Sequence, residues 1–171
     1  MPTADELIAL LGLQPHPREG GHFRETYRAV EQLPAAALPP RYRAPRSLGT
    51  AIYYLLTPGT CSALHRLASD EIFHFYLGDP VRMLQLLPDG QGKEVLLGPD
   101  LLRGQSPQVV VPQGVWQGSV LEPGGTFALL GCTVAPGFDY ADYEHGNRAA
   151  LLPQYPDFGD LIKRLTPQEP H

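Results

Sequence analysis

The feature that most constrains the fold of this chain is a series of short apolar runs between residues 50 and 134, each followed by turn residues. The chain holds 19 prolines and 18 glycines, a composition typical of a protein with short strands and many turns. The runs of strand length are Thr50–Thr57, Ser62–Leu67, Glu71–Leu77, Val81–Leu87, Lys93–Leu97, Gln108–Val111, Gly118–Leu121 and Thr126–Val134. Their even spacing, with no helices between them, predicts a β-sandwich or β-barrel.

Helices are expected only near the two ends of the chain. Thr3 and Glu6 have the spacing of a capping box, and they predict a short helix over residues 3–12. Residues 143–152 and 158–165 also have helical spacing, interrupted by prolines. We therefore expect an all-β fold with a short N-terminal helix and C-terminal helices, forming a single domain over residues 1–171 with a barrel core over about 22–136.

Two further segments precede the strand series. Residues 22–30 alternate in polarity and predict a strand on which Glu25 and Arg28 point to opposite faces. Residues 31–47 are rich in proline and alanine and carry three arginines. We expect this stretch to be an exposed excursion from the barrel.

Composition excludes several classes of protein. Hydrophobic residues make up 43% of the chain and charged residues 18%, which is too apolar for a disordered protein. The net charge of −5 argues against nucleic acid as a partner, and no apolar run is long enough to span a membrane. With no secretory leader at Met1, we expect a cytoplasmic protein in which Cys61 and Cys132 are buried free thiols, with a disulfide or a reactive thiol as the alternative.

The strongest chemical signal lies in the run Gly59–Gly78, where His65 precedes Glu71 by six residues. The turn at Ser69-Asp70 would fold two strands back on each other, so that both side chains could face one small volume. An imidazole and a carboxylate can bind a divalent metal, or can act as a base and its orienting partner. The alternative is a His–Glu hydrogen bond with no chemistry.

Several neighbours would complete a pocket around this pair. Phe73 and Phe75 share a strand face with Glu71, and with Trp116 they are expected to form an apolar wall. Trp116 could stack on a ligand or pack in the core. Gln117 could hydrogen-bond a ligand or bind a metal weakly. His74 falls on the opposite face, together with Ile72 and Tyr76, where packing or a subunit contact is expected.

Two other stretches are dense in polar and aromatic groups, residues 16–27 and residues 135–143. Either could line a barrel opening, although their glycines and prolines also suit plain turns. The Gly20-Gly21 pair is not part of a phosphate-binding loop, because no lysine or further glycine follows at the required spacing.

The chain resembles a known family over nearly its whole length. Gly59, His65, Glu71 and Gly78 match the first cupin motif, and Pro112 and Gly114 match the second. More specifically, the chain is similar to the cupin_5 (DUF985) group through HPREGGHFRETY, TAIYYLLTPG, SALHRLASDEIFHFYLGDPV, VVVPQGVWQG and LLGCTVAPGFDYADYE. The resemblance implies a double-stranded β-helix of the RmlC-like jelly-roll type, usually a homodimer. It implies no established reaction.

The sequence also departs from the metal-binding cupin pattern. Leu67 occupies the position of the second histidine of the first motif, and Gln117 occupies the position of the histidine of the second motif. The resemblance therefore implies a reduced metal set of His65, Glu71 and Gln117. Such a set lacks the imidazoles that hold iron, manganese or zinc firmly. The cofactor is unknown at this stage, and a divalent metal stays an open alternative.

Two functions are compatible with such a pocket. The first is an isomerase or epimerase acting on a small polar molecule such as a sugar or sugar nucleotide, by analogy with dTDP-4-dehydrorhamnose 3,5-epimerase, which has a similar fold and needs no metal. His65 would be the base, oriented by Glu71, and Tyr76 or Tyr140 the acid. The residues expected to contact the ligand are Glu25, Arg66, Phe73, Phe75, Trp116 and Gln117, with Arg24 and Arg66 as candidates for a phosphate.

The second function is a non-catalytic binding module that uses the same pocket to capture a small molecule. A weakly metal-dependent isomerase or dioxygenase is a third alternative. Fold analogy by itself does not decide among these.

Overall fold

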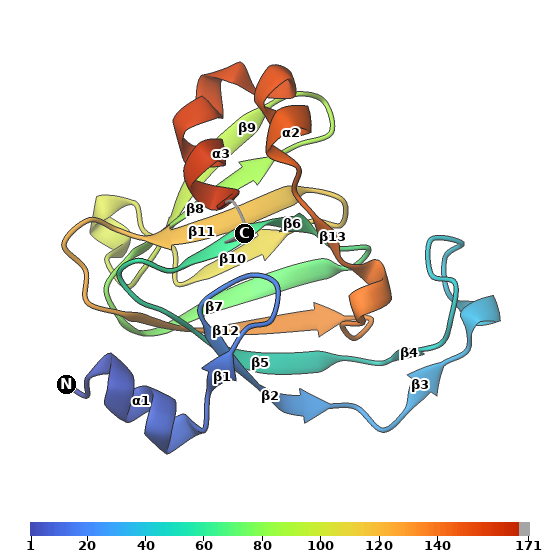
Figure 1. Cartoon of the computed structure of the whole chain (residues 1–171). Helices are drawn as coiled ribbons and strands as arrows, with labels where there is room; N and C mark the ends of the chain where they lie inside the picture. Colours follow the sequence, from blue (N-terminus) through green and yellow to red (C-terminus); the bar gives the residue numbers. More distant parts are fainter. Residues whose placement is uncertain (168–171) are drawn as a thin grey trace.

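The computed structural model describes residues 1–167 and shows two antiparallel sheets that enclose an apolar interior (Figure 1). The six-stranded sheet has the order β1 (Gln14–Pro15), β2 (His22–Arg28), β5 (Thr50–Leu56), β12 (Ala128–Ala135), β7 (Asp70–Gly78) and β10 (Gln108–Val111). The five-stranded sheet has the order β13 (Glu144–His145), β6 (Cys61–Arg66), β11 (Trp116–Leu121), β8 (Val81–Leu86) and β9 (Gly92–Leu97). The predicted all-β jelly roll is confirmed, and each predicted strand is present within a few residues of its expected ends.

The main core lies between the two sheets. Alternate residues of each strand point inward, so Tyr54 and Leu130 of one sheet meet Met83 and Leu97 of the other. All four side chains are buried. Fully burying one such side chain contributes about 1.5–3 kcal/mol, so this layer is the main source of stability.

Helices cover the outer faces, as predicted for the two ends of the chain. α2 (Arg148–Gln154) and α3 (Gly159–Leu165) lie beside the five-stranded sheet (Figure 1). Their Leu151 and Ile162 pack in one apolar cluster with Leu64 and Leu84 of that sheet. α1 (Ala4–Leu11) packs on the six-stranded sheet through a separate apolar cluster. Single-turn 3₁₀ helices lie at Ala35–Ala37, Leu101–Arg103, Tyr140–Asp142 and Pro156–Phe158. No helix within residues 1–167 has the length and apolar character needed to cross a membrane.

The capping box predicted for α1 is present. The Thr3 side chain accepts a hydrogen bond from the Glu6 amide, and the Glu6 carboxylate accepts one from the Thr3 amide at 2.8 Å. Gly12 ends the helix with a left-handed backbone, at φ 60°. Such a cap stabilises a short helix by about 1 kcal/mol.

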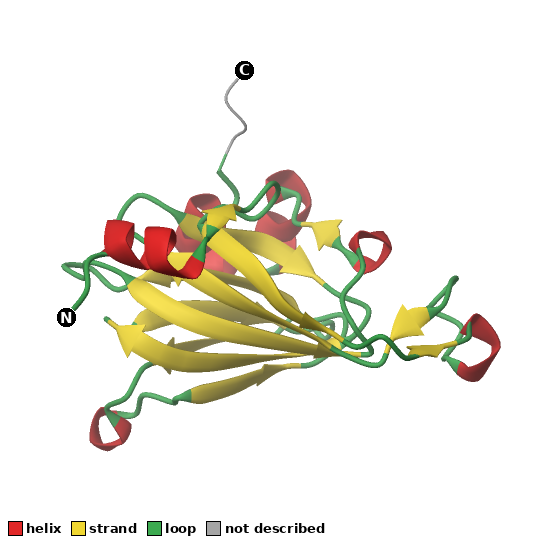
Figure 2. Ribbon diagram, turned by 90° about the horizontal axis from the view of Figure 1, so that it is seen from below, coloured by secondary structure: helices red, strands yellow, loops and turns green. Residues whose placement is uncertain are grey.

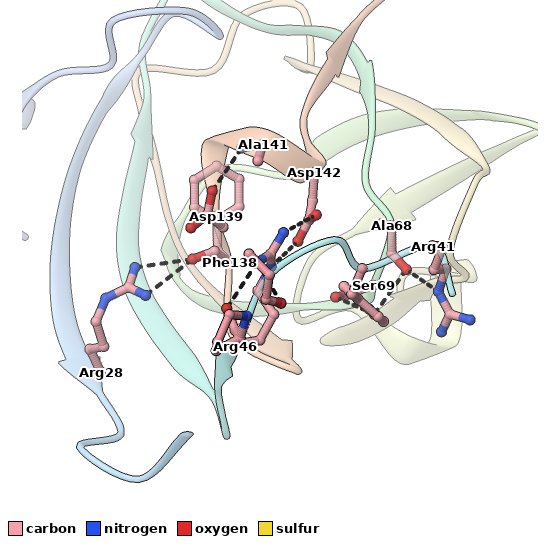
Figure 3. Close-up of polar contacts among 12 residues, drawn as sticks. Arg28, Arg41, Arg46, Ala68, Ser69, Phe138, Asp139, Ala141 and Asp142 are labelled. Carbon is pink, nitrogen blue, oxygen red and sulfur yellow. Dashed lines mark hydrogen bonds and ion pairs between the residues drawn. The ribbon is translucent and has the colours of Figure 1, made fainter. Parts of the chain in front are cut away.

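The segment 29–47 is an arm that extends from the barrel, with a short pair of strands, β3 (Gln32–Leu33) and β4 (Arg46–Ser47) (Figures 1 and 2). The prediction of an exposed excursion holds only for its outer part. At its base Arg46 is 3% exposed and forms a two-pronged ion pair with Asp142, at 2.6 and 2.7 Å (Figure 3). The buried Tyr42 hydroxyl contacts Ser69 at 2.7 Å. The arm is therefore fixed to the loop that precedes β13 and to the turn between β6 and β7.

Three β-bulges interrupt the strand pairing within the described residues, one of them between β11 and β6 at Gln117 and Ser119. The pairing of β2 with β5 shifts between Glu25 and Tyr27, and that of β12 with β7 shifts between Leu129 and Leu130. A bulge inserts one extra residue and reverses the alternation beyond it. The bulge in β2 brings Arg28 to the same side as Glu25, contrary to the prediction.

Candidate functional site

A cavity of about 310 Å³ lies at one end of the barrel, bounded mainly by the six-stranded sheet and by the loops around residues 16–19 and 138–140. Its volume is at the lower end of the range for small-molecule sites. The lining residues are His16, Glu19, Phe23, Glu25, Arg28, Thr50, Ile52, Tyr54, Leu67, Glu71, Phe73, Cys132, Val134, Phe138, Asp139 and Tyr140. Its wall thus combines aromatic rings with several carboxyl groups.

Glu71 places a buried carboxyl group in the cavity wall. It lies near the start of β7, between β10 and β12, where its partners are Val111 and Val134. The side-chain amide of Gln117 donates a hydrogen bond to Glu71 Oε2. Burial raises the pKa of Glu71 from 4.5 to about 7, and the nearby carboxyl of Glu19 acts in the same direction, against the lowering effect of His65. Glu71 can therefore hold or release a proton near neutral pH.

His65 lies beside Glu71, as predicted, but it does not line the cavity. Its Nε2 is 4.0 Å from Glu71 Oε2, and its side chain is almost completely buried. Its Nδ1 lies 2.7 Å from the Ala63 carbonyl oxygen, which can only accept, so Nδ1 donates. Tyr143 stacks on the ring at a centroid distance of 5.2 Å.

The electrostatics of His65 follow from this packing. Burial has the largest effect on the pKa of His65 and lowers it below 6.5, although Glu71 acts in the opposite direction. The ring is then neutral, with the proton on Nδ1 and a lone pair on Nε2. That lone pair faces Glu71 and Glu19, whose Oε1 is 3.7 Å away. The expectation that His65 is a base in contact with a ligand is therefore corrected: it can act only through the two carboxyl groups.

Glu19 is the functional candidate that sequence reasoning did not single out. Burial raises its pKa from 4.5 to about 7, partly offset by a hydrogen bond from Ser62. Its carbonyl accepts from the Ala63 amide at 2.8 Å, which ties the loop to β6. Gly20, at φ +89°, permits this approach, because a Cβ there would lie 2.5 Å from the Cys61 carbonyl oxygen. The only signal in the sequence was the polar, glycine-containing character of residues 16–27.

His16 supports the same loop. Its Nδ1 accepts from the Glu19 amide at 2.9 Å and from the Arg18 amide at 3.3 Å, so it carries no proton there. Burial, and to a lesser degree the neighbouring His65, lowers the pKa of His16 to about 4. His16 is thus a neutral ring whose Nε2 lies 3.6 Å from Glu19.

Three more of the predicted site residues lie in the cavity wall: Glu25 and Phe73, which were expected to contact the ligand, and Tyr140, a candidate acid. Arg28 joins them because of the bulge in β2. It forms a two-pronged ion pair with Glu25 at 2.8 and 2.9 Å. It also donates to the Phe138 carbonyl oxygen at 3.1 Å (Figure 3). Its guanidinium is therefore already engaged by the protein.

Other predicted site residues lie elsewhere. Phe75 packs against the main core but is not part of the cavity wall. Trp116 packs against the apolar cluster beneath α2 and α3, because it alternates with the inward-facing Gln117. Arg66 lies over the Trp116 ring at 4.5 Å and pairs with Glu144 at 2.7 Å. None of these three residues can contact a molecule in the cavity.

Tyr76 is also misplaced by the prediction. Its side chain is 51% exposed and stacks with His74 at 6.4 Å on the outer face of the six-stranded sheet. His74 donates to or accepts from Thr133 at 3.0 Å there, in agreement with its predicted outward orientation. Tyr76 therefore cannot be an acid in the cavity, and of the two tyrosines named only Tyr140 reaches it.

The reduced metal set does not fit a metal ion. Gln117 points its amide nitrogen, a donor, at Glu71 instead of its carbonyl oxygen. Within residues 1–167 no group of three or more histidine, cysteine, aspartate or glutamate side chains is placed to hold a metal ion. Cys61 and Cys132 are free thiols, as predicted, but only Cys132 is buried, and Cys61 is partly exposed. We derive no step through a metal.

Comparisons with known proteins agree with this fold. The family model described as Cupin superfamily (DUF985) matches residues 5–146. A Saccharomyces cerevisiae protein named "Uncharacterized protein YML079W" is 34% identical over 134 residues, which cover 74% of this chain and 67% of the yeast protein. The crystal structure of protein SO0799 from Shewanella oneidensis is 37% identical, covers 99% of this chain and 100% of that one, and has a TM-score of 0.85.

A dTDP sugar isomerase from Desulfovibrio desulfuricans is more distant. It is 18% identical and has a TM-score of 0.53, with coverage of 78% of this chain and 88% of that one. At this level of identity the similarity shows the fold alone.

Proposed function

Because the chain belongs to the cupin_5 (DUF985) family and its barrel holds a cavity, we propose that it is an isomerase- or epimerase-like enzyme that moves a proton on a small polar molecule. The observation that carries the proposal is the Glu71 carboxyl, which lines the cavity and has its pKa raised to about 7 by burial. A general base is most effective when its pKa lies near the working pH. Glu71 meets this condition, whereas His65 does not reach the cavity.

The roles of the residues follow from their positions. The Glu71 carboxylate takes a proton from the carbon next to a substrate carbonyl, and the electron pair of that C–H bond moves to the carbonyl oxygen as an enolate. Return of the proton from the Glu71 or Glu19 carboxyl to the same carbon gives the epimer. Return to the former carbonyl carbon gives the isomer, and it also requires the hydroxyl proton of the neighbouring carbon to move to the enolate oxygen, so that the new carbonyl forms there. His65 and Gln117 are positioning residues, because both contact or face the carboxyl groups from behind the cavity wall.

The position of His65, which does not line the cavity, also supports the second candidate, a binding module without catalysis. Proton exchange with solvent separates the two. The protein is incubated in D₂O with D-glucose, D-mannose, D-fructose and D-glucosamine, and the protons next to each carbonyl are followed by ¹H NMR. We expect one of these signals to decay in the presence of the protein.

The matched variants are Glu71→Gln and Glu144→Gln. The first removes the base, and we expect the exchange rate to fall by at least about 10²-fold. The second alters an exposed ion pair outside the cavity and should leave the rate unchanged. A sugar that binds without exchange would refute the enzyme and favour the binding module, and equal rates in the two variants would remove Glu71 from the mechanism.

A further inference from the structure

We propose that the cavity selects a positively charged ligand, a small molecule that carries an amine beside its hydroxyl groups, over neutral or phosphorylated analogues. The inference rests on the proposed function in that it concerns the same cavity, and it names the charge of what enters. It departs from the sugar nucleotide that the sequence suggested.

The first argument is the balance of charge in the wall. Among the described residues that line the cavity, four are carboxylic acids, Glu19, Glu25, Glu71 and Asp139, and one is an arginine, Arg28. Arg28 is held by Glu25 and by the Phe138 carbonyl. His16 is neutral because its Nδ1 accepts two backbone amides. Glu19 and Glu71 therefore have no cation beside them in the described part of the wall. Arg28, in contrast, pairs with Glu25 and also attracts Asp139.

The second argument is the nature of the partners of the two buried acids. Glu71 accepts from the Gln117 amide, and Glu19 accepts from the Ser62 hydroxyl at 3.3 Å, so both partners are uncharged. His65 presents an Nε2 lone pair to both acids. A buried carboxylate is unfavourable without a cation or several strong donors. An ammonium group in the cavity would supply the charge and the donors that the protein does not.

The third argument is the aromatic content of the same wall. The rings of Phe23, Phe73, Phe138 and Tyr140 line the cavity with the acids. Cations bind favourably over such rings, and the Arg18 guanidinium already lies 5.1 Å from the centroid of Tyr140. Acids and aromatic faces together favour an amine over a phosphate.

Among the described residues that line the cavity, a phosphate would find one guanidinium, that of Arg28, which is already held by Glu25 and the Phe138 carbonyl. Arg24 lies over Tyr53 at 5.8 Å, and Arg66 lies over Trp116, so neither is part of the cavity wall. The acids would also repel it, since like charges in a confined, poorly solvated space interact strongly. Both arginines that the sequence offered for a phosphate are thus excluded from this role in the cavity.

The test uses three probes with the same carbon chain and different charge: glucamine (1-amino-1-deoxy-D-sorbitol), D-sorbitol and D-sorbitol 6-phosphate. None has a carbonyl, so binding is measured without turnover. By isothermal titration calorimetry at pH 8 and low salt, we expect glucamine to bind at least tenfold more tightly than sorbitol, with the phosphate weakest. Added salt should narrow the difference in affinity among the three probes.

Three variants, one of them a control, examine the origin of the charge preference. Glu71→Gln should weaken the binding of glucamine at least fivefold and leave the binding of sorbitol unchanged, whereas Glu144→Gln should change neither affinity. Glu25→Gln releases Arg28 and should strengthen binding of sorbitol 6-phosphate.

Equal affinity for glucamine and sorbitol, tightest binding of the phosphate, or no binding of glucamine would each overturn the inference. Proton exchange on a neutral sugar without a charge preference would overturn this inference alone, and a charge preference without exchange on any sugar would overturn the enzyme alone.

Discussion

Replacing Glu71 by glutamine should stabilise the protein at alkaline pH, although Glu71 is buried in a hydrogen-bonded site. The reason is that the folded protein raises the pKa of this carboxyl from 4.5 to about 7. A raised pKa means that the folded state favours the protonated form. Its stabilising contribution is fully present below pH 4.5 and is lost as the pH rises through 7.

The magnitude follows from the two pKa values. The difference between 4.5 and about 7 corresponds to about 3 kcal/mol in the free energy of unfolding, of which about 2 kcal/mol is lost between pH 5 and pH 8. Glutamine is uncharged at every pH, and its carbonyl oxygen can still accept from Gln117. We expect the difference in unfolding free energy between Glu71→Gln and the parent protein to favour the variant by about 2 kcal/mol more at pH 8 than at pH 5.

Urea denaturation at the two pH values measures this difference in unfolding free energy directly. In thermal melts, the difference in Tm between the variant and the parent protein should be about 4–8 °C larger at pH 8 than at pH 5. The control is Glu144→Gln, whose side chain is 56% exposed and whose effect should stay within about 0.5 kcal/mol at both pH values. A Glu71→Gln effect of the same size at pH 5 and pH 8 would show that Glu71 is ionised in the folded protein throughout, and the argument for its catalytic role would fail with it.

Three further predictions concern the scaffold. Arg46→Met leaves the buried Asp142 carboxylate unpaired and should lower the free energy of unfolding by about 2 kcal/mol or more. Leu130→Ala opens a cavity in the main core and should lower it by about 2–5 kcal/mol. Gly78→Ala should lower it by more than about 2 kcal/mol, because the residue has φ +102° and a Cβ there would collide with the Phe127 carbonyl oxygen. Urea denaturation monitored by circular dichroism measures all three.

Each of these substitutions has a counterpart on the surface. Arg103→Met removes an exposed ion pair, and Leu102→Ala truncates a fully exposed side chain, so both should change stability by less than about 0.5 kcal/mol. Gly90→Ala shares a positive φ of 88° but has open space around its Cβ. It isolates the backbone strain, which is about 1 kcal/mol, from the collision at Gly78. Equal losses in a buried variant and its counterpart would contradict the packing described here.

The strands could be predicted from the sequence because their signals are local. Asp89-Gly90 lies between two apolar runs, and the structure pairs these runs as β8 and β9, with Val81 opposite Leu97. The capping box at Thr3 and Glu6 is equally local. The proximity of His65 and Glu71 could also be predicted from the sequence, since a short turn joins two adjacent segments whose inward faces were correctly assigned.

The side of the sheet that each residue faces was less predictable. Trp116 could have been placed correctly, because it precedes the inward-facing Gln117 and a strand alternates with a period of two. Arg28 could not, because the bulge in β2 arises from its pairing with β5 and leaves no mark in the residues themselves. Glu19 lies in a loop whose path depends on a distant contact with Ala63.

The two walls that close the cavity come from distant parts of the chain, with Glu19 on one and Phe138 and Tyr140 on the other. During synthesis on the ribosome, the acids at positions 19 and 71 emerge long before the segment that covers them. They stay hydrated until β12 and the loop after it are added. Because β12 pairs with both β5 and β7, the six-stranded sheet is incomplete until this strand is added, so the transfer of these carboxyl groups out of water accompanies the closure of the barrel itself.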